Sequence, residues 1–215
     1  MKVLELFAGT RSISKAFEKR RHETFSVEWD RDFEKIDLYA DIGNLNAEMI
    51  IEMFGKPDVI WASPDCTTFS IAAISHHRIK RENTLEPKSE YAKFCDKVDK
   101  NMLKLIHDLE PMYYFIENPR GGMRKMEWMQ EYPRYTVTYC QYGDTRMKPT
   151  DIWTNHPDPQ FKPMCRNGDP CHERAPRGAK TGTQGLKGSR ERSIIPPELC
   201  EHIVDICERG INENT

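Results

Sequence analysis

A cysteine occupies a polar turn in the stretch WASPDCTTFS, residues 61–70. The strand-like run 58–62 ends at Ser63 and Pro64, and Cys66 then stands between an aspartate and two threonines. A thiolate is a strong nucleophile even near neutral pH, so a cysteine at the end of a strand could carry out covalent catalysis. The other interpretation is a half-buried free thiol with no chemical role. The position of Cys66 at the end of a strand does not decide between these two interpretations.

Other polar residues follow strand-like segments in the same way. Glu28 and Glu117 each come at the end of such a segment, Gly9 follows the first of them, and Asp41 lies in a short third one. In open α/β sheets, ligands bind beyond the carboxyl ends of the strands. Five such residues at equivalent positions predict one shared site at that edge, formed by Gly9, Glu28, Asp41, Cys66 and Glu117.

The elements that would position these residues alternate along the chain. Strands are expected at 3–7, 24–28, 39–42, 58–62, 112–116 and 135–139, and helices at 14–20, 46–54, 89–109 and 196–209. This alternation over residues 1–155 predicts an α/β fold with a doubly wound sheet and helices on both sides. The uniformly apolar run 112–116 is typical of a strand buried on both faces.

Apolar spacing also predicts which helix faces are buried. Met49, Ile50 and Met53 are expected on one face of the helix 46–54. Steps of three and four define the stripe of the long helix, which consists of Tyr91, Phe94, Val98, Met102, Leu105 and Leu109.

Composition limits the class of protein. The chain has 215 residues and a net charge of −2, so it fits one domain, and nucleic-acid binding would need a local basic patch. We see no secretory leader and no apolar run near the roughly 18 residues of a membrane span. Seven scattered cysteines then favour a reducing cytoplasm and mostly free thiols.

The region 156–191 differs from the rest, because it is rich in glycine, proline, lysine and arginine. Residues 162–192 contain eight basic and three acidic residues, a local net charge of +5. We predict a basic segment that contacts a partner at 156–191, followed by a C-terminal part, 192–215, whose helix returns to the main domain.

Zinc is one possible use for residues of this region. His156, Cys165, Cys171 and His172 are candidate ligands, but they lack a tight C-x2-C pair, and adjacent ligands are geometrically awkward. Unpaired thiols are therefore the preferred interpretation, and no metal is expected.

Taken in order, these motifs resemble the DNA (cytosine-5)-methyltransferase family. Residues 7–9 resemble its cofactor loop, residues 63–70 its proline-cysteine catalytic loop, and Glu117-Asn118 its glutamate-asparagine motif. Residues 141–146 are a looser match to an arginine-bearing motif, and residues 192–198 to a late motif that supports target recognition. The resemblance covers nearly the whole chain and suggests a compact, phage-like member.

The resemblance implies a Rossmann-like fold that uses S-adenosylmethionine as cofactor, with a small irregular recognition lobe. Glu28 would accept the ribose hydroxyls, Asp41 would accept the adenine amine or cap a helix, and Trp29 would stack on adenine or belong to the core. The implied cofactor-binding residues are Phe7, Ala8, Gly9, Thr10, Glu28, Trp29, Asp41, Ile42 and Pro64.

The implied reaction is methyl transfer to C5 of cytosine in DNA. Cys66 would add to C6, Glu117 would hold N3 and the exocyclic amine, and Asn118 would orient the backbone. Arg146 would lie beside the base or its phosphate, with Lys148 as a possible helper. The substrate is expected to be duplex DNA with a flipped cytosine, bound by a monomer in the cytoplasm of a bacterial host.

A basic segment after the catalytic loop is a second DNA-contact candidate. It is expected to be mobile and to close over phosphates, or else to be an ordinary solvated loop, and it contains His76, His77, Arg78, Lys80 and Arg81. The +5 segment is the better candidate for the DNA-binding face.

Departures from the family pattern keep two other functions open. Asp65 stands where a second proline is usual, Pro119 where valine is usual, and Arg11 where glycine is expected. The terminal glycine-asparagine-proline segment is not recognisable. One alternative is a degenerate homologue that binds DNA or cofactor without catalysis. The other is an enzyme of the same scaffold that acts on RNA or a nucleotide.

Overall fold

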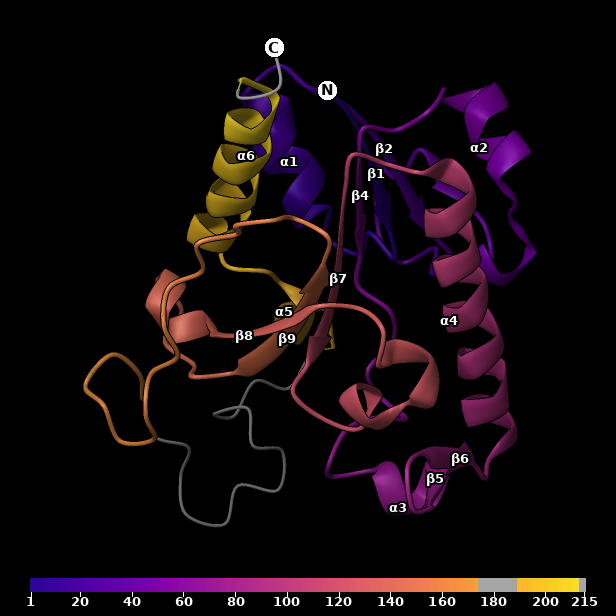
Figure 1. The fold of residues 1–215 in the computed structure, drawn as a ribbon, viewed down its shortest axis with the longest axis vertical. Helices are drawn as coiled ribbons and strands as arrows, with labels where there is room; N and C mark the ends of the chain where they lie inside the picture. Colours follow the sequence, from indigo (N-terminus) through magenta and orange to yellow (C-terminus); the bar gives the residue numbers. More distant parts are fainter. Residues whose placement is uncertain (174–188, 213–215) are drawn as a thin grey trace.

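The computed structural model describes residues 1–173 and 189–212. Its centre is a seven-stranded sheet with the order β3-β2-β1-β4-β7-β9-β8 (Figure 1). The first five strands in this order are parallel, and β9 is antiparallel to both of its neighbours. The strands are β1 (Lys2–Leu6), β2 (Glu23–Glu28), β3 (Leu38–Tyr39), β4 (Val59–Ala62), β7 (Tyr113–Pro119), β8 (Arg134–Thr138) and β9 (Pro149–Thr154).

Helices cover both faces of this sheet, as the sequence predicts. On one face lie α2 (Ala47–Met53) and α4 (Glu90–Leu109), and on the other α1 (Ser12–Lys19) and α6 (Pro197–Asn212) (Figure 1). Alternate residues of β1 and β4 enter opposite cores: Leu4 and Ile60 pack on the α4 side, whereas Val3 and Trp61 pack on the α6 side. The doubly wound α/β prediction is confirmed.

The predicted alternation of strands and helices fails after α4. The chain instead joins β7, β8 and β9 through single turns of 3-10 helix: η2 (Met123–Lys125), η3 (Glu127–Met129) and η4 (Tyr139–Tyr142). The sequence did not indicate β9, and β7 continues to Pro119 rather than ending at residue 116. The reason is the antiparallel ladder, which pairs Glu117 with Ile152 and so carries the strand past the glutamate.

The prediction of the buried face of the helix 46–54 is also wrong. In α2, Ile50 is fully buried, but Met49 and Met53 are exposed. The helix has only seven residues, and Ile50 is its one buried position, so the neighbouring methionines are left in solvent. Within 1–173 and 189–212, no helix combines the length and apolar character that a membrane crossing requires.

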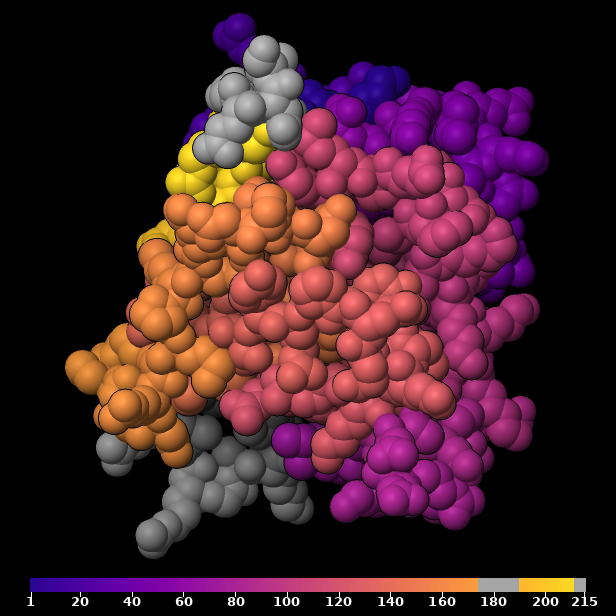
Figure 2. All heavy atoms as spheres, in the orientation of Figure 1, coloured from indigo at the N-terminus to yellow at the C-terminus, as the bar shows by residue number. Residues whose placement is uncertain are grey.

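Shorter elements complete the described chain. They are η1 (Ile42–Asn44), α3 (Ile74–His77), the hairpin strands β5 (Arg78–Lys80) and β6 (Leu85–Pro87), and α5 (Ser189–Ser193). Figure 2 shows the segment after β7 and residues 156–173 side by side on one face of the molecule. Of the predicted basic segment, Arg174, Arg177, Lys180 and Lys187 lie outside the described residues.

Candidate active site

Cys66 lies on a tight turn beyond the carboxyl end of β4. Its carbonyl oxygen accepts hydrogen bonds from the backbone N–H groups of Phe69 (3.0 Å) and Ser70 (2.9 Å). Asn118 Nδ2 on the neighbouring β7 donates to the Pro64 carbonyl at 2.9 Å, and Gly122 N donates to the Phe69 carbonyl at 2.7 Å. Because β4 and β7 are adjacent parallel strands, these bonds fix the cysteine turn to the chain that carries Glu117 and Asn118.

Glu117 is a buried carboxylate in β7, and its charge acts on Cys66. Its Oε1 accepts a hydrogen bond from the Tyr139 hydroxyl at 3.0 Å. Burial, and after it the charges of Asp65 and Glu117, raise the pKa of the Cys66 thiol to about 11, whereas Lys148 lowers it. The sequence-predicted pair of thiol and carboxyl therefore lies close enough for the charge of Glu117 to act on Cys66.

Lys148, rather than Arg146, is the cation that acts on this pair. Burial lowers the pKa of Lys148, while the charges of Glu117 and Cys66 raise it. The Arg146 guanidinium is instead held by the Asp144 carboxylate, with Nε 2.9 Å from Oδ1. The Arg146 Nη1 atom is buried without a hydrogen-bond partner among the described residues, so the part that the motif comparison gave to Arg146 stays a prediction.

Arg78 does not belong to a mobile DNA-contacting loop. It is buried, its Nη2 lies 2.7 Å from Asp96 Oδ1 on α4, and its guanidinium stacks over the Phe69 ring at 3.9 Å. It also donates from Nε to the Thr68 carbonyl at 3.1 Å. The prediction is wrong for this residue because Asp96 neutralises its charge inside the protein, where it braces the cysteine turn. His76, Lys80 and Arg81 remain exposed.

The loop after β1 has an unusual backbone. Phe7, Gly9 and Arg11 all have positive φ values, of 55°, 49° and 57°. Such values are rare for residues with side chains, and they cluster at functional sites. Arg11 thus occupies a left-handed position that a glycine would occupy without strain, which accounts for the glycine usual at that point of the motif.

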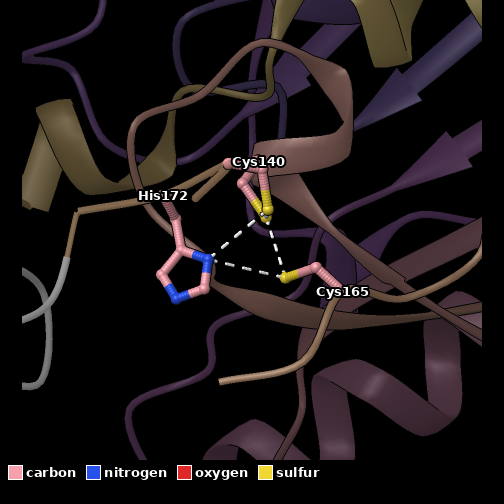
Figure 3. A group of neighbouring side chains, drawn as sticks. Cys140, Cys165 and His172 are labelled. Atoms are coloured by element: carbon pink, nitrogen blue, oxygen red, sulfur yellow. Dashed lines mark hydrogen bonds between the residues drawn. The ribbon is translucent and has the colours of Figure 1, made fainter. Parts of the chain in front are cut away.

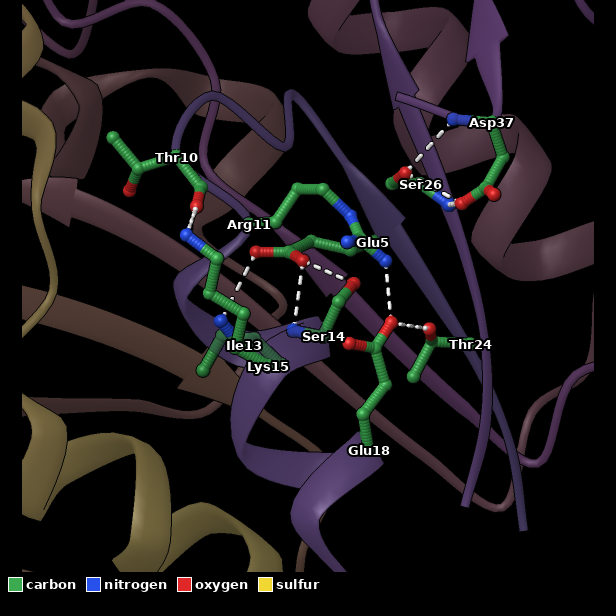
Figure 4. Close-up of polar contacts among 10 residues, drawn as sticks. All are labelled: Glu5, Thr10, Arg11, Ile13, Ser14, Lys15, Glu18, Thr24, Ser26 and Asp37. Atoms are coloured by element: carbon green, nitrogen blue, oxygen red, sulfur yellow. Dashed lines mark hydrogen bonds and ion pairs between the residues drawn. The ribbon is translucent and has the colours of Figure 1, made fainter. Parts of the chain in front are cut away.

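A buried glutamate holds this loop from below (Figure 4). Glu5 in β1 accepts hydrogen bonds from the backbone N–H groups of Ile13 (3.2 Å) and Ser14 (2.8 Å) and from the Ser14 hydroxyl. Arg11 is the N-cap residue of α1 but makes no side-chain cap, so Glu5 satisfies the open amides of the first turn instead. Burial raises the pKa of Glu5 to about 7 despite these bonds.

The two carboxylates expected to bind cofactor also shape the backbone. Glu28 accepts hydrogen bonds from the N–H groups of Gly9 (2.9 Å), Trp29 (2.9 Å) and Asp30 (3.0 Å). A carboxylate has about four acceptor positions, so one remains for a hydroxyl. Asp41 caps η1 by accepting from Gly43 N at 2.8 Å, which is the capping role that the sequence had left open.

An open cavity lies at this edge of the sheet. Four of the predicted cofactor residues line it, namely Phe7, Trp29, Asp41 and Ile42, whereas Gly9 and Glu28 do not. Trp29 is 60% exposed, so the alternative that it belongs to the core is wrong. Ala8 is buried, Thr10 Oγ1 pairs with Ser12 Oγ at 2.8 Å, and Pro64 bonds Asn118; none of these lines the cavity.

Sequence reasoning missed the other wall of the cavity. It consists of Asp65, Tyr91, Phe94, Cys95, Val98 and Asp99. The Tyr91 hydroxyl donates to Asp65 Oδ2 at 2.5 Å, which links α4 to the residue before the cysteine. Asp99 is buried, its Oδ2 has no hydrogen-bond partner among the described residues, and burial together with the charge of Asp96 raises its pKa.

The zinc candidates are only partly brought together. Cys165, Cys171 and His172 converge, but His156 lies elsewhere, with Nε2 3.2 Å from the Ile206 carbonyl and its ring against Tyr113. The fourth member of the cluster is Cys140 on η4, which the sequence analysis did not consider.

The sheet order and the site at the carboxyl edge define a doubly wound, Rossmann-like α/β fold. The chain matches none of the sequence profiles of known protein families. It is similar, at 29% identity over 227 residues, to the protein named "Probable DNA (cytosine-5)-methyltransferase" of Frog virus 3 (isolate Goorha). That similarity covers 96% of this chain and 100% of the viral protein, and it supports the resemblance indicated by the motifs.

A solved structure shows the same fold. It is that of a protein assigned as a DNA modification methyltransferase and encoded within an E. coli prophage, and it matches with a TM-score of 0.52 at 16% identity. The match covers 72% of this chain and 46% of the prophage protein. The chain therefore spans about half of that protein's length, and the shared part is the α/β scaffold.

Proposed function

We propose that the chain transfers a methyl group from S-adenosylmethionine to C5 of cytosine in DNA. One observation carries the proposal: Cys66, on the turn after β4, and Glu117, in the adjacent strand β7, interact electrostatically at the carboxyl edge of the sheet, and Asp65 beside the cysteine lines a cavity there. The Frog virus 3 protein, similar over nearly the whole chain, is named for this activity.

The lining of the cavity suits S-adenosylmethionine. Trp29 presents an exposed ring for stacking on adenine, and Asp41 is an acceptor for an amine group. Asp65 adds a carboxylate that suits a ligand with a sulfonium and an ammonium group. When bound, the cofactor supplies an electrophilic methyl group.

The protein's own residues make the cytosine ring reactive. The Cys66 thiolate forms a bond to C6, which shifts electron density to C5, and the same bond breaks at the end, when C5 loses its proton. Glu117 hydrogen-bonds N3, and a proton held between the two balances the charge that develops as sulfur adds and is given up when sulfur leaves. The net change replaces one hydrogen at C5 by methyl and releases one proton.

Duplex DNA with a flipped cytosine is the substrate form we infer. A cysteine on a recessed turn cannot reach C6 inside a base stack, and flipping costs a few kcal/mol of unstacking. The described chain from 1 to 173 ends where the predicted basic segment continues, so DNA contacts by that segment remain a prediction. A monomeric state and a bacterial host also remain predictions. The similar protein of Frog virus 3 is viral.

The test is direct. Purified chain is incubated with tritiated S-adenosylmethionine and duplex DNA, and the digested product is analysed for 5-methyldeoxycytidine. We expect product with the wild type and none with Cys66→Ser, which should still bind the cofactor. Parallel reactions on single-stranded DNA, RNA and dCMP identify any other substrate. Product with Cys66→Ser, or none with wild type on any substrate, contradicts the proposal.

A non-catalytic DNA- or cofactor-binding homologue is the second candidate, and one observation favours it. Asp65 stands directly before Cys66, and its charge raises the thiol pKa beyond the effect of burial. In that case the protein binds cofactor and DNA but forms no product. Trapping with DNA that contains 5-fluorocytosine separates the two, because only a reacting cysteine becomes covalently attached.

A further inference from the structure

Four metal-binding side chains converge at a place remote in sequence from Cys66. Cys140 comes from η4, while Cys165 and His172 come from the irregular chain after β9 (Figure 3). Cys171 belongs to the same irregular chain. Their ligand atoms all lie within 4.8 Å of one another. The Cys140 and Cys165 sulfurs are 3.1 Å apart, and the Cys171 sulfur is 3.6 Å from that of Cys140.

The His172 imidazole completes this group of four side chains. His172 Nδ1 lies 3.7 Å from the Cys165 sulfur and 3.6 Å from the Cys171 sulfur. With Zn–S bonds of about 2.3 Å, sulfurs at two corners of a tetrahedron are roughly 3.8 Å apart, so small movements would centre an ion. If Nδ1 binds the metal, the ring proton lies on Nε2. The long hydrogen bond of 3.4 Å that Gly168 N now donates to Nε2 is then lost.

We propose that Cys140, Cys165, Cys171 and His172 bind one structural zinc ion that fastens the start of the basic segment to the catalytic domain. Three thiolates and one imidazole are a common zinc ligand set, and four protein ligands leave no open position for catalysis. This revises the expectation of unpaired thiols with no metal. That expectation considered His156 together with this segment and did not consider Cys140.

The surrounding contacts suit an ordered metal site. Gln141 Nε2 donates to the Cys171 sulfur at 3.5 Å, and Cys165 N donates to Thr138 Oγ1 at 3.0 Å. Such N–H···S bonds and backbone anchors orient ligands around a metal. Thr138 and Gln141 belong to β8 and η4, the same stretch of chain that carries Cys140.

A metal would supply the stability that apolar packing does not. In residues 156–173, Phe161 is partly buried, Met164 is 40% exposed, and the buried apolar residues are Pro159 and Cys165. A segment with so little core needs a metal or another cross-link to hold one conformation. Glu173 N also donates to the Thr145 carbonyl at 2.9 Å, so the zinc would fix this segment against the loop leading to Lys148.

Metal content tests the proposal without any assay of activity. The full chain is purified under reducing conditions without chelator, and zinc is measured by mass spectrometry. We expect about one zinc per chain in the wild type and at least a tenfold loss in Cys171→Ser and in His172→Ala. His172→Cys restores a four-ligand set and should retain the metal. Cys66→Ser, a half-buried cysteine outside the cluster, and His107→Ala, an exposed histidine, should both keep it.

A second measurement uses only wild-type protein, so it does not depend on whether the variants fold. Wild-type protein stripped of metal is titrated with cobalt(II), and the expected result is a thiolate-to-cobalt charge-transfer band that saturates at one equivalent. Less than about 0.1 zinc per chain together with no such band would overturn the proposal. Full zinc retention in Cys171→Ser and His172→Ala would do the same, as would a Cys140–Cys165 disulfide in the wild-type peptide map.

Discussion

Lys148 lies where its charge lowers the pKa of the Cys66 thiol, in opposition to the burial and the two carboxylates that raise it. Lys148 is itself fixed in place: its Nζ donates to the Arg192 carbonyl at 3.0 Å and lies 4.4 Å from the centre of the Tyr139 ring. The same Tyr139 donates to Glu117. Lysine, tyrosine and glutamate therefore form one buried group that sets the ionisation of the cysteine.

Removing the ammonium group should make the cysteine harder to ionise. The thiol pKa is already raised to about 11, so the thiolate fraction increases with pH across the neutral and alkaline range. In Lys148→Met the pKa rises further, and a change of one unit gives about tenfold less thiolate at a fixed pH. We expect slower alkylation of the Cys66 peptide by iodoacetamide and a pH–rate profile displaced upward. Lys56→Met, at an exposed lysine, is the control; identical alkylation rates in the two variants would contradict this role.

Asp65 should have the opposite effect. Its carboxylate raises the pKa of the Cys66 thiol, so Asp65→Asn should lower that pKa and accelerate alkylation at a fixed pH. The comparison variant is Tyr91→Phe, which removes the 2.5 Å hydrogen bond to Asp65 but keeps the charge. Acceleration in Asp65→Asn but not in Tyr91→Phe assigns the effect to charge. Equal rates in wild type and Asp65→Asn would show that the carboxylate does not act on the thiol.

The arrangement of the site at one edge of the sheet could be predicted because parallel strands bring their carboxyl ends together. Gly9, Glu28 and Cys66 are far apart in sequence, but the order β2-β1-β4 places them at or just beyond the carboxyl ends of neighbouring strands. The pattern of short apolar runs was sufficient for this step, because it needs only strand positions and the rule for parallel sheets.

Residues whose role depends on partners distant in sequence could not be predicted. Tyr91 and Phe94 continue the apolar stripe of α4, and periodicity cannot show that their part of the stripe faces a cavity rather than the core. Arg78 appears to be an ordinary surface charge until Asp96 on α4 is placed beside it. Cys140 is 25 residues from Cys165, and only the fold of β8 and η4 brings the two sulfurs together.

The glycine pair after β7 should be intolerant of even one added methyl group. A Cβ on Gly121 would lie 2.6 Å from the Phe69 carbonyl oxygen, a backbone atom of the cysteine turn. The turn would have to move, and misplacement of a reacting group by about 1 Å can cost about a hundredfold in rate. We expect Gly121→Ala to lose turnover to that extent while its affinity for S-adenosylmethionine stays near the wild-type value, since Gly121 does not line the cavity. The control is Ser75→Ala, at an exposed position that follows the cysteine turn in sequence. Wild-type turnover in Gly121→Ala would contradict the expectation.

Stability should fall as pH rises through neutrality, because of Glu5. Burial raises its pKa from 4.5 to about 7, so the folded state holds a proton that the unfolded chain has already released in this interval. Its contribution is fully present below pH 4.5 and is lost as pH rises through about 7, by on the order of 3 kcal/mol in the free energy of unfolding. Glu5→Gln keeps an acceptor for the first turn of α1 but cannot ionise, so urea denaturation at about pH 5 and pH 8 should show a smaller decline in the variant than in the wild type. Glu23→Gln, at an exposed carboxylate, should decline as the wild type does; a Glu5→Gln curve parallel to the wild type would show that Glu5 is ionised throughout.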